Sequence, residues 1–318
     1  MRWGLIGTRG YARKSAAPGV IASERGRLVA VLGRDPETTR AFAQTNAARD
    51  FTDIDAFLAG GIDAVWITSP TWLHREQASA ALGAGLHVLC EKPMARSSKD
   101  AWAMVEAAAA GGKTLAMGYQ GRYVPGHRAM AELIARGAIG DVTVARTYYG
   151  VHRPGPPPEW RTKRPLARWG ALADVGTHHI DLLRMLLGEI TEAHGIIGHQ
   201  LGYETEDVAA GSLRFQSGAV ATLTATVNVW RQQTRVEVYG TKGLLVATDT
   251  NPAGQGQVVW YDGTTPEGHD ITGERPSNLW AAQIDAVTAA ASGEDVSYAS
   301  GEDGARNVDV LEQLSPEA

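Results

Sequence analysis

The stretch RWGLIGTRGYA, residues 2–12, joins an apolar run to a glycine-containing turn at the start of the chain. A dinucleotide-binding turn after a first strand usually reads G-x-G-x-x-G/A. Gly7 and Ala12 fill the first and last of these places, whereas Arg9 takes the middle place and Gly10 follows it. Two interpretations stay open: a phosphate-binding turn, in which the Arg9 guanidinium reaches a phosphate, and an ordinary tight turn.

Further apolar runs follow the first one at short intervals, with helical stretches between them. Such runs indicate strands of a sheet that is covered on both faces. The repetition predicts an α/β dinucleotide-binding Rossmann domain over residues 1–120, with a doubly wound parallel sheet. The expected strands are residues 2–7, 27–33, 64–69, 86–90 and 114–119, and the expected helices are 36–45, 74–85 and 97–112.

The pattern changes near residue 120. Longer alternating runs between 209 and 262, joined by glycines, predict a large and mostly antiparallel sheet. We expect residues 121–318 to form an α+β domain for substrate binding and oligomerisation. Because an open-faced sheet leaves apolar residues uncovered, a homodimer or homotetramer through this sheet is expected. The other expected elements are helices at 125–137, 171–187, 277–291 and 301–314, a strand at 141–151 and a Pro-rich loop at 152–169.

Composition narrows the class of protein. The chain has 318 residues, a net charge of −5 and one cysteine. The charge argues against general nucleic-acid binding, and no apolar run reaches the ~18 residues of a membrane span. A single cysteine, Cys90, excludes an internal disulfide. With no signal-peptide core at the N-terminus, these features favour a cytoplasmic protein that binds neither nucleic acid nor membrane.

The end of the second strand favours NADP over NAD as the cofactor. An NAD site normally has an acidic residue there for the ribose hydroxyls. This chain has Gly33 and then Arg34, which removes the repelling carboxylate and offers a cation to a 2′-phosphate. Asp35 is better explained as the cap of a helix that starts at Pro36.

The stretch LHVLCEKPMA, residues 86–95, delivers Glu91, Lys92 and Pro93 directly from an apolar strand. Strands of such sheets end at the ligand crevice. A lysine at that place can hydrogen-bond a substrate oxygen and stabilise negative charge. The alternative is a lysine that simply reaches solvent from the strand end.

The stretch DVGTHHIDLL, residues 174–183, contains a second candidate cluster. Asp174 and His178 are four residues apart, so both share one face of a helix, and Asp181 lies on the same side. A carboxylate beside an imidazole fixes its tautomer and raises its proton affinity. A plain surface pair is the alternative. No metal site is expected, because the adjacent His178 and His179 diverge by ~100° on a helix.

Taken in order, these motifs resemble the glucose–fructose oxidoreductase/inositol dehydrogenase (Gfo/Idh/MocA) family over nearly the whole chain. Within the family, LHREQ, EWRTKRP and LRFQSG are most similar to NADPH-dependent 1,5-anhydrofructose-reductase-type members. The other matching stretches are GLIGTRGYA, SPTWLHREQ, GLHVLCEKP, GYQGRYVPGHRAM, DVGTHHIDLL, LRFQSGAVATL, VYGTKGLL and SGEDGARN.

The resemblance implies hydride transfer between nicotinamide and a hydroxyl or carbonyl carbon of a carbohydrate-like substrate. It implies Lys92, Asp174 and His178 as the catalytic set: Lys92 polarises the substrate oxygen, His178 exchanges its proton and Asp174 orients His178. The residues expected to contact NADP, or NAD instead, come from several stretches. They are Gly7, Thr8, Arg9, Gly10, Tyr11, Ala12, Gly33, Arg34, Ser69, Pro70, Thr71, His74, Glu91, Lys92, Trp160 and Arg161.

Three departures from the family pattern bear on this expectation. Arg9 replaces a common glycine, Gly33 replaces a common acidic residue, and Arg168-Trp169-Gly170 stands where a glycine run is common. Trp169 either narrows the substrate pocket or belongs to an oligomer interface. Two other functions stay open: a redox-neutral glycosidase that retains NAD, and a non-catalytic regulator that senses a nucleotide.

Overall fold

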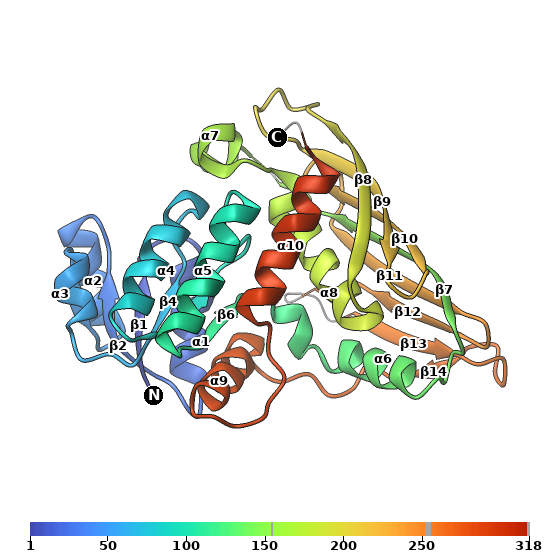
Figure 1. The fold of residues 1–318 in the computed structure, drawn as a ribbon, viewed down its shortest axis with the longest axis horizontal. Coiled ribbons are helices and arrows are strands. Elements are labelled where there is room, and N and C mark those ends of the chain that lie inside the picture. The colour runs from blue at the N-terminus through green and yellow to red at the C-terminus, as the bar shows by residue number, and fades with distance from the viewer. Residues whose placement is uncertain (154, 252–255, 317–318) are drawn as a thin grey trace. The chain divides into compact units, whose positions relative to one another are not determined.

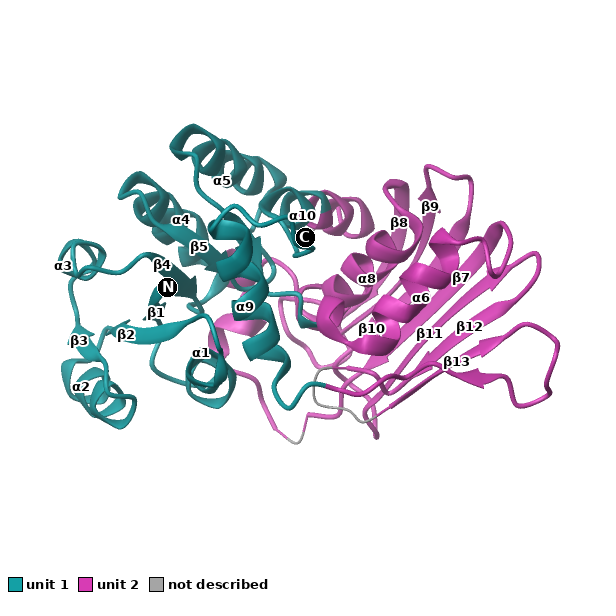
Figure 2. Ribbon diagram, turned by 90° about the horizontal axis from the view of Figure 1, so that it is seen from below, with its two compact units in different colours: residues 1–120, 276–306 teal, residues 121–275, 307–318 magenta. Residues whose placement is uncertain are grey.

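The computed structural model describes residues 1–153, 155–251 and 256–316. The chain divides into two compact units, one of residues 1–120 and 276–306, the other of residues 121–275 and 307–318 (Figure 2). Residues 121–318 were expected to form a single second domain. In the structure, residues 276–306 return to the first unit.

A parallel sheet of six strands forms the centre of the first unit (Figure 1). The strands are arranged in the order β3-β2-β1-β4-β5-β6, so the chain reverses direction across the sheet at β1. This is the doubly wound topology that the sequence predicts. The strands are β1 (Arg2–Ile6), β2 (Arg27–Leu32), β3 (Arg49–Phe51), β4 (Ala64–Ile67), β5 (His87–Cys90) and β6 (Leu115–Met117).

Helices connect these strands, and side-chain caps mark where several of them begin. Asp35 accepts a hydrogen bond from the Thr38 amide at the start of α2, which confirms its expected capping role. Ser97 caps α5 in the same way, and Gly112 ends that helix with a left-handed backbone. The helices of this region are α1 (Ala17–Ala22), α2 (Pro36–Thr45), α3 (Ile54–Leu58), α4 (His74–Gly83) and α5 (Ser98–Gly111).

Helix α9 (Leu279–Ala291) explains why residues 276–306 belong to the first unit. It packs on α1, where a Cβ on Gly19 would lie 2.6 Å from the Cβ of Trp280. Its Thr288 hydroxyl accepts a hydrogen bond of 3.2 Å from the Trp3 indole of β1. Ile284 and Val287 complete the same apolar core. A glycine on one helix therefore permits close contact with a helix from the far end of the chain.

The second unit contains a mixed sheet in the order β14-β13-β12-β11-β7-β10-β9-β8. Only the β7–β10 pair is parallel, so the expected mostly antiparallel sheet is confirmed. Buried and exposed residues alternate along β7 and β10, so one face of the sheet is packed and the other is open. The strands are β7 (Val142–Gly150), β8 (Ile190–Gly198), β9 (Val208–Phe215), β10 (Val220–Thr226), β11 (Gln233–Gly240), β12 (Leu244–Thr248), β13 (Gln257–Tyr261) and β14 (His269–Asp270).

The helices of the second unit are α6 (Pro125–Ala135), α7 (Arg164–Ala167) and α8 (Thr177–Leu187), and α10 (Gly301–Leu314) spans the division between the units. Two expectations need correction here. The segment 152–169 is not entirely a loop, because Glu159–Thr162 forms a 3₁₀ turn and α7 follows, with Pro165 in its first turn. The helix expected over 171–187 is two pieces, a π-helical turn over Leu172–Gly176 and then α8.

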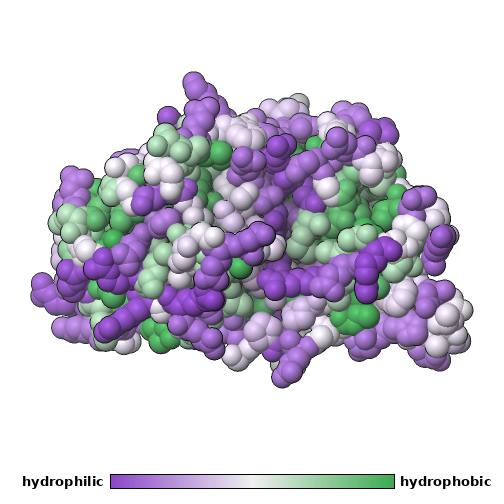
Figure 3. All heavy atoms as spheres, turned by 60° about the horizontal axis from the view of Figure 1, so that its bottom comes forward, coloured by the Kyte–Doolittle hydropathy of each residue, from purple (hydrophilic) through white to green (hydrophobic). Residues whose placement is uncertain are grey.

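Along the described part of the chain, no helix is long and apolar enough to cross a membrane. On the face drawn in Figure 3, hydrophobic side chains form separate patches among hydrophilic ones.

Candidate active site

The turn between β1 and the first helical residues has the backbone of a phosphate-binding loop. Gly7 and Gly10 have φ angles of 122° and 50°, a region that favours glycine. A side chain at Gly7 would collide with Thr68, whereas the space beside Gly10 is open. Because Gly10 carries the left-handed conformation, Arg9 fits the middle place of the motif without a positive φ. These features fit a dinucleotide.

The end of β2 has no room for the acidic side chain of an NAD site. A Cβ on Gly33 would collide with Thr39 and would lie 2.8 Å from the Thr8 methyl group. Arg34, the next residue, is exposed to solvent. The Arg9 guanidinium also reaches this region, where its Nη2 donates to the Thr38 hydroxyl at 3.3 Å. The end of β2 therefore has two arginines near it, Arg9 and Arg34, and no room for an acidic side chain at Gly33.

His74 connects the segments that follow β4 and β5. It is 1% exposed, and its Nδ1 and Nε2 atoms lie 3.0 and 2.8 Å from the carbonyl oxygens of Pro93 and Ser69. Burial lowers the pKa of the ring. A neutral ring can donate to only one of these two carbonyl oxygens, and the expected contact of His74 with the cofactor stays a prediction. The Ser69 hydroxyl donates to Gln77 at 2.5 Å.

Glu91 is buried, although it directly follows β5 and precedes Lys92. Its side chain accepts a hydrogen bond of 3.3 Å from the Trp66 indole. Burial raises its pKa from 4.5 to about 7, an effect that Lys92 and the Tyr11 hydroxyl partly oppose. A Cβ on Gly118 would lie 2.6 Å from its Oε1, so a glycine is needed there. The expectation that Glu91 lines the cofactor stays a prediction, as does the catalytic role of Lys92.

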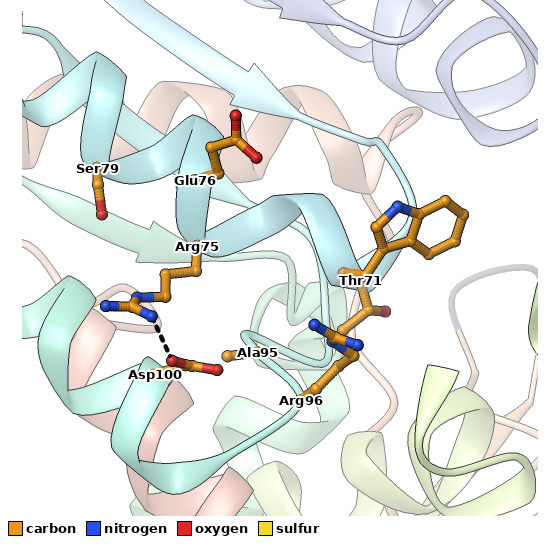
Figure 4. Close-up of a pocket in the computed structure, with 8 residues that line it drawn as sticks. Thr71, Arg75, Glu76, Ser79, Ala95, Arg96 and Asp100 are labelled. Carbon is orange, nitrogen blue, oxygen red and sulfur yellow. Dashed lines mark ion pairs between the residues drawn. The ribbon is translucent and has the colours of Figure 1, made fainter. Parts of the chain in front are cut away.

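A cavity of about 440 Å³ opens at the start of α4 and beside the residues after β5 (Figure 4). Arg75 and Asp100 point toward one another across it and form an ion pair of 2.8 Å. Thr71, one of the residues expected at the nicotinamide, contributes to its lining. The complete lining is Thr71, Trp72, Arg75, Glu76, Ser79, Ala95, Arg96 and Asp100.

In the second unit, Asp174 lies between two arginines. Arg161 Nη1 binds its Oδ1 at 2.6 Å, and Arg153 Nη2 binds its Oδ2. Asp174 belongs to the π-helical turn, and the wider turn changes the register before α8 begins. Asp174 thus lies in the π-helical turn and His178 in α8, four residues later and about one helical turn away. Their joint catalytic role stays a prediction.

The histidines of α8 have different surroundings. His178 is partly exposed, with its ring centroid 6.3 Å from that of Tyr149. His179 is 5% exposed, and its ring centroid lies 5.0 Å from the same tyrosine. Burial and the neighbouring His127 lower the pKa of His179 to about 3. Of the two, His178 is the histidine open to a substrate.

Asp181 is not part of the cluster that the sequence suggested. It is 2% exposed and binds Arg122 through both carboxylate oxygens, at 2.7 and 2.9 Å. Asn307 also donates to it, at 3.1 Å. Asp181 is therefore a structural partner that holds Arg122 and α10. Among the described residues, no group of three or more His, Cys, Asp or Glu side chains could hold a metal ion.

Tryptophans 160 and 169 differ in exposure. Trp160 is partly exposed, with the Arg161 guanidinium 5.0 Å above its ring, and its contact with a cofactor stays a prediction. Trp169 is 1% exposed, with the Arg168 guanidinium 4.5 Å above its ring. A side chain so deeply buried in its own chain offers no surface to an oligomer interface.

Sequence reasoning missed two residues that shape the site, Glu206 and Arg153. Glu206 is 2% exposed and accepts hydrogen bonds from the amides of Gly170 and Leu172, which anchor the turn that carries Asp174. Arg153 was treated only as part of a basic loop. The expected contact of Tyr11 with the cofactor stays a prediction, and its hydroxyl oxygen accepts hydrogen bonds from Gln120 and Trp280 inside the first unit. No local pattern marks any of these partners.

Comparison with known families explains this combination of turn, strand ends and second sheet. Residues 1–119 match the oxidoreductase family with an NAD-binding Rossmann fold, and residues 127–246 match the GFO/IDH/MocA C-terminal domain. The chain belongs to the Gfo/Idh/MocA family of oxidoreductases. The resemblance read from the motifs is thereby confirmed.

Individual relatives agree with this assignment. The 1,5-anhydro-D-fructose reductase of Ensifer adhaerens is 34% identical over 308 residues, covering 95% of this chain and 92% of the relative. The D-xylose 1-dehydrogenase (NADP(+)) 2 of Haloferax volcanii is 30% identical over 80% of this chain and 76% of its own. The crystal structure of aldose-aldose oxidoreductase from Caulobacter crescentus, complexed with glycerol, superposes with a TM-score of 0.90. It is 27% identical and covers 99% of this chain and 96% of its own.

Proposed function

We propose that this Gfo/Idh/MocA oxidoreductase uses NADP(H) and acts on a hydroxyl or carbonyl group of a sugar-like substrate. The bound nicotinamide supplies or accepts the hydride. The substrate class is supported by the names of the relatives, which act on an anhydro-sugar, a xylose and an aldose. The cofactor preference is supported by Gly33, which leaves no room for an acidic side chain, with Arg34 and Arg9 near it.

For the catalytic residues we propose the roles that the family resemblance implies. Lys92, at the end of β5, would hold the substrate oxygen through its ammonium group and stabilise negative charge on it. His178 would exchange the proton of that oxygen. Asp174, held by Arg153 and Arg161, would orient His178.

Cofactor preference is tested by titrating tryptophan fluorescence with NADPH and, separately, with NADH. We expect NADPH to bind at least about tenfold tighter, which corresponds to ~1.4 kcal/mol. Replacing Arg34 by Ala should weaken NADPH binding about tenfold or more and leave NADH binding unchanged, because only NADPH carries the 2′-phosphate. Arg40→Ala, an exposed position of the same helix region, is the matched control. Tighter binding of NADH, or NAD that stays bound through purification, would favour the NAD-retaining glycosidase instead.

The role of Lys92 is tested by Lys92→Met. The variant should lose at least about a hundredfold in kcat, since the charge that stabilises the substrate oxygen is gone, while NADPH still binds. Lys99→Met removes an exposed lysine from α5 of the same unit and should leave turnover intact. Full turnover in Lys92→Met would overturn the proposed mechanism.

We also propose that the open face of the second sheet binds a second copy of the chain. Val144 of β7 and Val220 of β10 lie side by side in the register and are 42% and 41% exposed. The charges around them are largely paired within the sheet, as in Arg146–Glu237 and Arg214–Glu192. The open face thus has an apolar centre, and the charges around it are already paired within the sheet. Such a surface is more complementary to the same face of a second copy than to a strongly charged partner.

A further inference from the structure

The ring of Tyr149, near the end of β7, packs against both histidines at the start of α8. Its centroid lies 6.3 Å from that of His178 and 5.0 Å from that of His179, with interplanar angles of 41° and 37°. Centroid separations of about 4.5–7 Å are those of aromatic rings in contact. One buried tyrosine of the sheet therefore contacts the histidine proposed to exchange a proton and the histidine next to it.

The backbone that carries Tyr149 is held on both sides. In the register of the sheet, Tyr149 lies opposite Ala225 of β10 and opposite Thr234 of β11. All three side chains are buried, so they share the packed face of the sheet. A strand that is paired on both edges cannot shift without breaking ladder hydrogen bonds. The sheet interior, and not a loop, therefore sets the position of the Tyr149 ring.

A close approach between two small residues sets the position of α8 above this ring. Gly176 ends the π-helical turn before α8, and a Cβ on Gly176 would lie 3.2 Å from the Cβ of Ala225. Larger side chains at these two positions would push the start of α8 away from the sheet. Because Ala225 is the register neighbour of Tyr149, this contact also brings the following His178 and His179 to the tyrosine ring.

The ionisation states of the rings indicate what Tyr149 can contribute. Burial raises the pKa of Tyr149 to about 12, and Arg153 opposes this rise only in part, so the hydroxyl keeps its proton near neutral pH. The pKa of His179, at about 3, leaves that ring neutral. His178 is partly exposed, and a histidine side chain has several staggered rotamers. A neutral ring packed against His178 limits which of these rotamers it adopts.

We propose that Tyr149 is a positioning residue, whose ring holds the imidazole of His178 in the orientation from which it exchanges a proton with the substrate oxygen. This role rests on the proposed function of His178. Tyr149 acts through the shape of its ring and not through its hydroxyl. Because proton transfer depends steeply on the distance and direction between the two groups, loss of the ring affects turnover more than binding.

The proposal is tested by comparing Tyr149→Leu with Tyr149→Phe. We expect Tyr149→Leu to lower kcat at least about tenfold, with little change in KM or in the Kd for NADPH. Tyr149→Phe keeps the ring and should keep kcat. Phe215→Leu is the matched control, because it removes another buried ring from the packed face of the same sheet, and it should keep kcat. If Tyr149→Leu does not fold, Tyr149→Met replaces it, since methionine fills irregular space in a core.

The contact itself is measured without turnover, in protein labelled with ¹³C in its histidine rings. The His178 signals are those missing from His178→Gln. The ring current of Tyr149 should displace them in the wild type and in Tyr149→Phe, and the displacement should be lost in Tyr149→Leu. Unmoved His178 signals or a full kcat in Tyr149→Leu would overturn the proposal, and so would an equal loss of kcat in Tyr149→Phe. Failure of the proposed function is a separate result, full turnover in His178→Gln.

Discussion

Glu91 gives the stability of the folded chain a pH dependence that can be worked out from a single residue. Its pKa is about 7 in the folded chain against an ordinary value of 4.5, because burial disfavours the carboxylate. The folded state therefore binds this proton more tightly than the unfolded state. The contribution of Glu91 to stability is therefore expected to fall as pH rises from about 4.5 to about 7, and to be lost above that range. A shift of this size corresponds to an effect on the order of 3 kcal/mol.

The Glu91→Gln variant removes this titration. We expect the wild type to lose stability relative to the variant between pH 5 and pH 8, as measured by urea unfolding at both values. Glu37→Gln, an exposed position of α2, should show no such difference. If the difference in the free energy of unfolding between wild type and Glu91→Gln is the same at both pH values, the expectation is wrong. A constant difference reports changed packing, whereas a difference that changes with pH reports titration of the carboxyl group.

At the scale of single elements, the π-helical turn before α8 depends on a residue from a distant segment. Glu206 Oε1 accepts from the amides of Gly170 at 2.8 Å and Leu172 at 2.9 Å, and the Ala171 amide bonds the Glu206 carbonyl at 2.9 Å. Gly170 is required because a Cβ there would collide with that carbonyl. This anchor sets where the turn that carries Asp174 begins.

Replacing Glu206 by Ala leaves these buried amides without an acceptor. We expect a loss of about 1–3 kcal/mol in the free energy of unfolding, measured in urea, together with a fall in kcat. The matched control lies two residues away: Glu204 is 49% exposed and pairs with Lys163 at 2.9 Å. Its replacement by Ala should cost less than about 1 kcal/mol, since the pair is on the surface. Equal losses in the two variants would show that Glu206 does not anchor the turn.

At the scale of the whole molecule, the open face of the second sheet determines the expected assembly. Val144→Glu would place a carboxylate in the centre of the proposed interface, and we expect a dimer or tetramer to dissociate toward the monomer. Light scattering after size-exclusion chromatography gives the mass directly. Ile21→Glu changes an apolar residue of α1 that is 58% exposed in the first unit, and it should leave the mass unchanged. A wild-type protein that is already monomeric at micromolar concentration would overturn the proposal.

The sequence by itself determined the local elements and the family. The strand after Met1, the turn at Gly7 and Gly10, the cap at Asp35 and the alternation along β7 and β10 were all readable, because hydrophobic period and turn residues act over short stretches. Short elements such as β3 and α7 were missed, since three or four residues carry too little periodicity to recognise.

Tertiary structure alone decided which side chains meet. The Trp280 indole reaches the Tyr11 hydroxyl across 269 residues of sequence, and Arg153 and Arg161 both bind the Asp174 carboxylate, which no sequence pattern indicated. The π-helical turn over Leu172–Gly176 was also not predictable from the sequence. The composition and the hydrophobic period describe one segment of sequence at a time. These contacts depend on how distant segments pack against one another, so only the folded chain determines them.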